Sequence, residues 1–92
     1  MWYNGYMKEL EKQLKALANK RRLAILKLLK SKQRLAVGDI ADVIKLSFKA
    51  TSKHLVILYS AGLLEKDQVN LTVLYRLSND LPSGISHIIT IL

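Results

Sequence analysis

Cysteine is absent from this 92-residue sequence, which excludes disulfides, thiolate metal sites and cysteine nucleophiles together. Long apolar stretches are absent as well, because uncharged runs such as LVILYSAGLL are far too short to cross a bilayer. The first residues lack the basic segment, apolar stretch and cleavage site of an export signal. Half of the residues are nevertheless apolar, enough for one core. We therefore expect a single cytoplasmic domain over residues 1–92.

Acidic residues are scarce. Asp and Glu together number seven against fifteen Lys and Arg, and the formal net charge is +8. The excess lies in residues 1–34, whereas residues 63–92 are slightly acidic, and such an excess favours a polyanionic partner, most commonly nucleic acid. A membrane surface is the alternative for the N-terminal segment, where Trp2, Tyr3 and Tyr6 stand beside Lys8 and Lys12. We expect nucleic acid, and no membrane, as the partner.

Catalytic and metal-binding groups are also few. The sequence has two histidines, no glycine-rich phosphate loop and no paired carboxylates beside an acid-base partner. His54 precedes an apolar position, and we interpret it as a structural or phosphate-facing residue. His87 lies on an apolar tail without a second histidine nearby, so we interpret it as structural. We expect no enzyme, no cofactor and no metal site.

Apolar residues spaced three and four apart predict helices along the first two thirds of the chain. The first helix runs from Met7 to about residue 18, and Asn19 is a suitable N-cap for a second helix over KRRLAILKLLKSK. A short third helix from Val37 stops near Lys45. The tight connection that follows predicts a helix-turn-helix over residues 36–60.

The fourth helix is the second half of that motif. Ser47 is a suitable N-cap for it, and Gly62 suits the left-handed position that follows a helix end near Ser60. The side chains expected to face inward from this helix are Thr51, Leu55 and Leu58. Lys49, Ser52 and Lys53 then lie on the outward side.

Beyond Gly62 the apolar period changes from three or four to two, which is typical of strands. We predict a hairpin over residues 63–77, with LLEKDQ as one strand and the turn around Val69 and Asn70. Pro82 and Gly84 then interrupt the chain before an apolar segment, ISHIITIL. Its spacing suits a helix and its β-branched residues suit a strand, and in either form it must pack on the domain or on a second copy.

The predicted order of helix, helix, helix-turn-helix and two-stranded wing is that of a winged helix-turn-helix, a mainly α fold with a small β-hairpin. From Leu17 to Leu77 the sequence resembles ArsR-type transcriptional regulators, through the segments LANKRRLAILKLL, DIADVIKLSFKATSKHLVIL and AGLLEKDQVNLTVLYRLS. The resemblance implies a homodimer that binds double-stranded DNA with the fourth helix in the major groove. It also implies release by an effector, often a metal ion, and, by analogy, repression of transcription.

The sequence departs from this family where metal-sensing members carry a Cys-Val-Cys box, because it reads Ala36-Val37-Gly38 there. Near the C-terminus, where other members bind metal through several histidines and carboxylates, only Asp80 and His87 occur. The wing carries only Lys66 where relatives often have several arginines, so we expect a weaker grip on phosphates. Any effector remains unidentified.

The residues expected to contact DNA lie on the fourth helix, at the start of the second helix and in the wing. They are Ser47, Phe48, Lys49, Ser52, Lys53, His54, Lys66, Gln68, Asn70, Arg21 and Arg22. For most of them a structural role is the alternative. Ser47 is also a cap, Asn70 also serves the turn, and Phe48 either packs between the helices or touches a thymine methyl group.

Two segments, residues 7–18 and 85–92, are expected to form the dimer interface together with the aromatic N-terminus. The interface residues predicted are Trp2, Tyr6, Leu10, Leu14, Ile85, Ile88, Ile89 and Leu92. Two other functions stay open at this point. A winged helix can be a protein-docking module, which exposed Val56 and Tyr59 would favour, and the basic first two helices could coat DNA without sequence preference.

Overall fold

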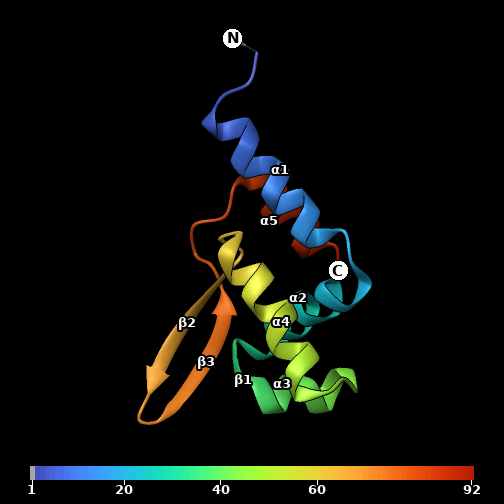
Figure 1. Cartoon of the computed structure of the whole chain (residues 1–92), viewed down its shortest axis with the longest axis vertical. Helices are drawn as coiled ribbons and strands as arrows, with labels where there is room; N and C mark the ends of the chain where they lie inside the picture. The colour runs from blue at the N-terminus through green and yellow to red at the C-terminus, as the bar shows by residue number, and fades with distance from the viewer. Residues whose placement is uncertain (1) are drawn as a thin grey trace.

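The computed structural model describes residues 2–92, which form five helices and a three-stranded sheet (Figure 1). The elements in chain order are α1 (Gly5–Leu17), α2 (Lys20–Lys32), β1 (Arg34–Ala36), α3 (Val37–Ile44), α4 (Phe48–Ser60), β2 (Leu64–Val69), β3 (Thr72–Leu77) and α5 (Ser83–Thr90). The predicted mainly α fold with a hairpin wing is confirmed. No helix in residues 2–92 has the length and apolar character needed to cross a membrane.

Side-chain caps set the starts of the helices. The Asn19 side chain accepts hydrogen bonds from the backbone N–H groups of Arg21 and Arg22, and the Ser47 hydroxyl accepts one from the N–H of Ala50. Both predicted caps are therefore confirmed. The first helix begins slightly before the predicted Met7, because Asn4 caps it.

Left-handed residues end the two helices of the helix-turn-helix. Lys45 follows α3 with φ 56°, and Gly62 follows α4 with φ 78°. The turn of the wing also uses this region, at Asn70 with φ 58°. The boundaries predicted at Lys45, Ser60 and Asn70 are confirmed.

The sheet has one strand more than predicted. Its order is β1-β3-β2 with both pairs antiparallel, and β1 pairs with β3 through Leu35 opposite Tyr75. The sequence predicts no strand between α2 and α3, because the three residues Arg34–Ala36 are too few to show a period of two. Its extra pairing anchors the wing hairpin to the helical body.

The core is built around α2, whose Ile25, Leu26 and Leu29 are buried among residues from the other helices. The C-terminal segment, whose form the sequence left open, is a helix that packs on α2. Ile85 and Ile89 are only 2% and 3% exposed within the monomer, so they stabilise the monomer's own core. The prediction that these two side chains line a dimer interface is corrected accordingly, because the monomer itself buries them.

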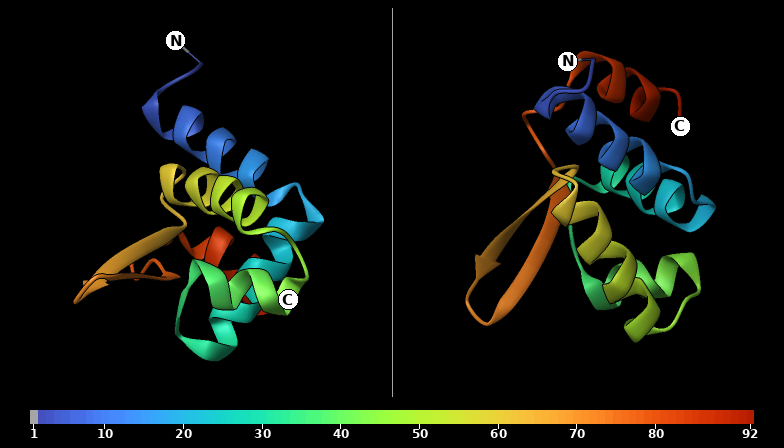
Figure 2. Two further views of the ribbon diagram at one scale, coloured as in Figure 1. Left: turned by 60° about the horizontal axis from the view of Figure 1, so that its bottom comes forward. Right: turned by 45° about the horizontal axis from the view of Figure 1, so that its top comes forward.

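The molecule is elongated, 45 × 27 × 23 Å, and its ends differ (Figures 1 and 2). In Figure 1, α1 and α5 lie at the upper end, whereas α3, the start of α4 and the tip of the wing lie at the lower end. The N-terminus extends from the upper end as well. The predicted dimerisation segments therefore lie at one end of the body, and α3, the start of α4 and the tip of the wing lie at the other.

Candidate nucleic-acid interface

Helix α4 is fixed to the core by one side only. Thr51, Leu55 and Leu58 are fully buried, as the period of the sequence predicted. Lys49 and Lys53 are exposed on the opposite side, and Ser52 between them is half-buried. The structure thus brings the predicted outward residues of α4 together on one surface, supported from behind by the core.

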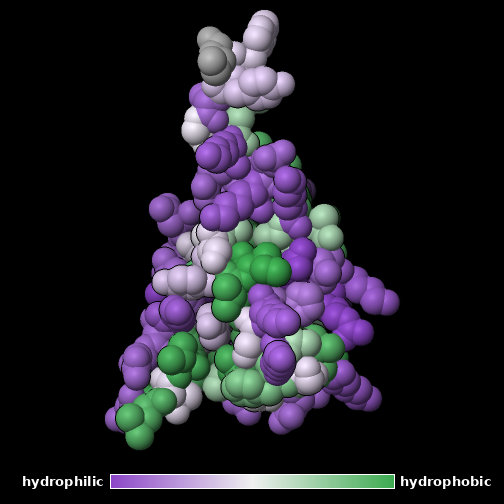
Figure 3. Space-filling model, in the orientation of Figure 1, coloured by the Kyte–Doolittle hydropathy of each residue, from purple (hydrophilic) through white to green (hydrophobic). Residues whose placement is uncertain are grey.

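This surface is more apolar than a row of lysines implies. Phe48, Val56 and Ile57 are 63%, 56% and 43% exposed, and together with Lys49, Ser52 and Lys53 they line a shallow groove of about 670 Å³. In Figure 3 a hydrophobic area in the middle of the face lies over α4 and is bordered by hydrophilic side chains. Because most of the Phe48 side chain is exposed, the structure does not support the alternative that it packs between the helices.

The two lysines of α4 are electrostatically available. Neither Lys49 nor Lys53 forms an ion pair within residues 2–92, where the salt bridges involve only residues of α1 and of the sheet. An exposed, unpaired ammonium group on a helix that is rigidly held is suited to bind phosphate or the O6 and N7 atoms of guanine. The charge on α4 can therefore act on a ligand.

Arg21 and Arg22, predicted as phosphate contacts, have different environments. Arg21 is exposed and forms no ion pair in the described part of the chain. Arg22 donates from Nε to the carbonyl oxygen of Ala16, at 2.6 Å, and from Nη2 to that of Lys15, at 3.3 Å. These carbonyls end α1, where a cation is favourable. Arg22 is therefore a structural residue that fastens α1 to α2, and only Arg21 remains a candidate for phosphate.

His54 lies beside Arg22 on the half-buried flank of α4. Its Nδ1 is 3.4 Å from Nη1 of Arg22, and burial, followed by the charges of Arg22 and Arg21, lowers the pKa of the ring. A ring that is neutral at pH 7 offers no positive charge to a phosphate. The structural interpretation of His54 therefore fits better than the phosphate-facing one. Residues 2–92 also bring no group of three His, Asp or Glu side chains together that could hold a metal ion.

The cations of the sheet, in contrast to those of α4, are paired. Arg76 on β3 forms ion pairs with Glu65 and Asp67 on β2, the latter with Nε and Oδ2 2.9 Å apart, and Arg34 on β1 is 3.5 Å from Asp67. The hydrogen bond from Arg76 is the main cause that holds the pKa of Asp67 below its ordinary value. This network ties the three strands to one another and leaves little free positive charge on the wing.

Lys66, Gln68 and Asn70, the wing residues predicted to contact DNA, also take part in contacts within the fold. The ammonium group of Lys66 lies 4.3 Å from the centre of the Tyr59 ring, a cation–π contact with α4. Gln68 donates to the carbonyl oxygen of Asn70 across the turn, at 3.3 Å. The tip beyond Asn70 is apolar instead of basic, since Leu71 is 97% exposed. Any contact between the wing and DNA would thus involve few charges.

An exposed apolar surface follows α1 and α5 at the other end of the molecule. Trp2, Tyr6 and Leu14 are exposed there, while Leu10, Ile88 and Leu92 are half-buried. The predicted segments 7–18 and 85–92 also contain Met7 and Ile91, which are 43% and 70% exposed but were not named among the individual interface residues. Met7 continues the apolar face of α1, as its spacing to Leu10 and Leu14 predicted.

Comparison with known proteins identifies the family to which this chain belongs. The model of the family described as "Bacterial regulatory protein, arsR family" matches residues 19–66, more than half of the chain, from the N-cap of α2 into β2. The chain belongs to the arsR family. The resemblance inferred from the sequence, and with it the class of transcriptional regulator, is confirmed. The match includes α3 and α4 but leaves out α1, β3 and α5.

Individual arsR-family relatives agree in fold. The chain is 42% identical over 66 residues to the transcriptional activator HlyU of Vibrio cholerae, covering 72% of this chain and 60% of that protein. A structure of HlyU from that organism superposes with a TM-score of 0.79, at 32% identity over 97% of this chain and 92% of the other. The homodimeric winged helix-turn-helix DNA-binding domain of Mb0332 from Mycobacterium bovis gives 0.80, at 29% identity over 94% and 76%.

Proposed function

We propose that this chain is a sequence-specific regulator that binds double-stranded DNA as a homodimer, with α4 in the major groove. The observation that carries the proposal is the division of α4 into a buried side and an outward side, whose two lysines form no ion pair in the described part of the chain. Membership of the arsR family supports it, as does the relative named a homodimeric DNA-binding domain. A DNA-reading role requires no enzymatic activity and suits the cytoplasm.

Each outward residue has a role in this arrangement. Lys49 and Lys53 contact phosphates or guanine edges near the start of α4, where a recognition helix meets the bases. The Ser47 hydroxyl accepts the hydrogen bond from Ala50 and can still donate its own proton to a phosphate oxygen. Ser52 contacts a base edge between the two lysines, and exposed Phe48 packs on thymine methyl groups.

Other predicted residues take secondary positions. Arg21 contacts the DNA backbone beside the start of α2. Lys66, Gln68 and Asn70 reach the backbone next to the groove only through a wing with little free charge. Specificity in this proposal therefore comes mainly from α4.

The dimer forms through the apolar surface at the opposite end of the molecule. Tyr6, Leu10 and Leu14 on α1, together with Ile88 and Leu92 on α5, meet their symmetry equivalents, and Trp2 extends the contact. A two-fold dimer of this kind would read two half-sites about one helical turn apart. Sedimentation equilibrium should give a dimer at micromolar concentration, and a monomer there would contradict this part of the proposal.

The direction of regulation is proposed as repression, by analogy with the family. HlyU is named a transcriptional activator, so the family name alone does not fix the direction for a member. A reporter placed behind the selected operator should fall when the chain is expressed. A rise would make the chain an activator and leave the DNA-binding proposal intact.

The test of the DNA-binding proposal is selection from a random duplex pool, followed by anisotropy titrations of the selected duplex and a scrambled one at two salt concentrations. A palindrome preferred at both salts is the expected result. Equal binding of both duplexes that is lost steeply with salt would show non-specific coating instead. Absence of binding would favour protein docking, the function suggested by exposed Val56 and Tyr59.

A further inference from the structure

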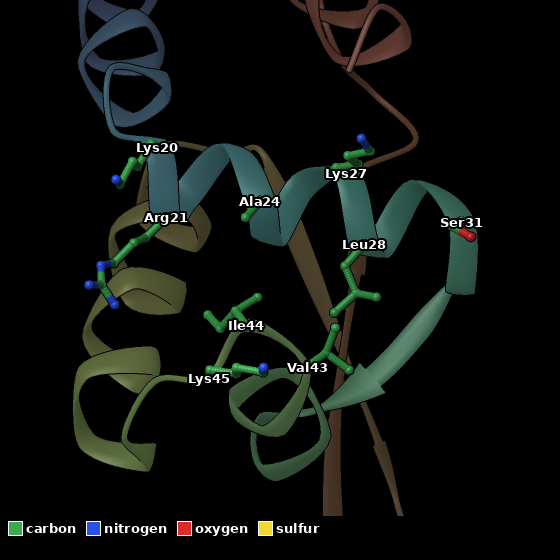
Figure 4. Close-up of a pocket in the computed structure, with 9 residues that line it drawn as sticks. All are labelled: Lys20, Arg21, Ala24, Lys27, Leu28, Ser31, Val43, Ile44 and Lys45. Atoms are coloured by element: carbon green, nitrogen blue, oxygen red, sulfur yellow. The ribbon is translucent and has the colours of Figure 1, made fainter.

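A groove lies between α2 and the C-terminal end of α3, on a face of the molecule that neither α1 nor the wing covers (Figure 4). Its volume is about 690 Å³, within the range of pockets that bind small molecules. Ala24 and Leu28 of α2 and Val43 and Ile44 of α3 form its apolar floor. In Figure 4, Leu28 points toward Val43, and Ile44 lies below Ala24. Val43 is 59% exposed, so this floor is open to a ligand.

Most of the residues around this floor are cationic. Lys20, Arg21 and Lys27 from α2 and Lys45 from the turn after α3 line the groove, and no Asp or Glu does. None of these four cations forms an ion pair within residues 2–92. Lys20 and Arg21 also stand at the N-terminus of α2, where the helix dipole adds to the positive potential.

The charged and the apolar residues of the groove lie at different positions along its length. Lys20 and Arg21 lie at one end, and in Figure 4 the ammonium group of Lys45 is directed along the groove toward Val43. From Lys20 to Ser31 the groove follows α2 for roughly 16 Å. A ligand that matches this surface has one anionic group and an extended apolar part.

We propose that this groove binds a medium-chain fatty acid, with the carboxylate at Arg21, the flexible Lys45 side chain turned back toward it from its position in Figure 4, and the acyl chain over Leu28, Val43 and Ile44. Burial of the chain supplies affinity, and the carboxylate supplies orientation through charge-assisted hydrogen bonds. This ligand class fits better than a purely polar anion, because the floor between the cations is apolar.

Such a ligand would also act on DNA binding, and this step rests on the proposed function. Arg21 is a proposed phosphate contact, and Lys45 is the residue that ends α3 and begins the turn to α4. A bound carboxylate neutralises the charge of Arg21 and restrains the side chain of Lys45. Fatty acid and DNA therefore compete, and each lowers the affinity of the chain for the other by the same factor.

The binding step is tested without DNA, by titrating the full chain with decanoate below its micellar concentration and recording ¹⁵N–¹H shifts. Saturable shifts in residues 20–31 and 43–45 are expected, and decanol, which has the same chain without the charge, should bind at least about tenfold more weakly. Equal affinity for decanol, or shifts confined to α1 and α5, would overturn the proposal.

Variants separate a specific groove from general positive charge. Arg21→Gln with Lys45→Gln should weaken decanoate binding about tenfold or more, whereas Lys12→Gln with Lys32→Gln, an equal loss of charge outside the groove, should not change it. Val43→Asn tests the apolar floor at an exposed position where folding is not at risk, and it should also weaken binding. Equal effects of both double variants would contradict a defined site.

The regulatory step is tested with the selected duplex. Saturating decanoate should raise the Kd of the wild-type chain for this duplex about tenfold, and it should leave the Kd of Val43→Asn unchanged. Decanoate that binds the groove without changing the Kd for DNA would overturn the regulatory step. If no duplex is selected at all, the proposed function fails, while the decanoate titration still decides the binding site.

Discussion

Helix α4 and the wing are the two elements that a winged helix presents to DNA. In this chain they differ in whether their cations are engaged in ion pairs. On α4, Lys49 and Lys53 are exposed and form no ion pair with any of residues 2–92, while on the wing Arg76 is engaged by Glu65 and Asp67. A count of cations would treat the two elements alike. The comparison shows that the availability of a charge depends on its neighbours: the wing arginines hold the sheet together, and the proposed recognition of DNA rests on α4.

The largest effect is expected from removing the free charges. Lys49→Ala with Lys53→Ala should lose about 3 kcal/mol of DNA binding, roughly a hundredfold in Kd, because two charge-assisted contacts disappear. The slope of log Kd against log salt should become shallower by about two. Anisotropy titrations of the selected duplex at several salt concentrations give both quantities.

The matched control is Lys12→Ala with Lys32→Ala, which removes the same charge from exposed positions of α1 and α2. It should change the Kd far less, and thermal unfolding of both double variants should match the wild type. If the α4 variant lost stability instead of affinity, its lysines would serve the fold.

Two adjacent arginines of α2 repeat the contrast between free and engaged cations. Arg22→Ala should lower the free energy of unfolding by about 2 kcal/mol, since it leaves the carbonyls of Ala16 and Lys15 without their donor. The melting temperature should fall by roughly 10 °C. Arg21→Ala is the control, and it should keep the melting temperature but weaken DNA binding. Equal melting temperatures for the two variants would contradict the assignment of Arg22.

The weak contribution that we expect the wing to make to DNA binding can be increased by substitution. Glu65→Gln with Asp67→Asn frees Arg76 and Arg34, and it should strengthen DNA binding by about threefold. Asp39→Asn with Asp42→Asn adds the same net charge on α3 without removing a partner of Arg76 or Arg34. If this control strengthens binding equally in anisotropy titrations, net charge and not the position of the arginines is responsible.

The smallest effect concerns the charge of His54. Its pKa is lowered in the folded chain, so the unfolded chain takes up the proton first as the pH falls below about 6.5. The contribution of the neutral ring to stability is therefore complete above that pH and is lost at lower pH. Urea unfolding of the wild type should weaken from pH 7 to pH 5 more than that of His54→Gln. Identical pH dependence would exclude the effect.

Local features of the sequence predicted most of the fold. Asn19 and Ser47 were recognisable as caps because capping uses residues two or three positions apart, and Asn70 marked the turn because few other residues accept positive φ. The inward side of α4 followed from its helical period. The form of the C-terminal segment stayed ambiguous because its isoleucines suit both a helix and a strand.

Features that depend on distant partners were missed. Strand β1 is defined by pairing with β3, which lies about forty residues later in the chain, and its own three residues carry no pattern. The role of Arg22 depends on how α1 packs against α2, and the pairing of Arg76 depends on the register of the hairpin. Charge could be counted from the sequence, but only the fold shows which charges are free.

The most direct test of the central claim is an ¹⁵N–¹H correlation titration of the wild-type chain with the selected duplex. Recognition by α4 predicts the largest shifts in residues 47–57, smaller ones around Arg21, and little change over β2 and β3. The largest shifts over residues 64–77, or over α1 and α5, would contradict the claim that the free cations of α4 carry DNA binding.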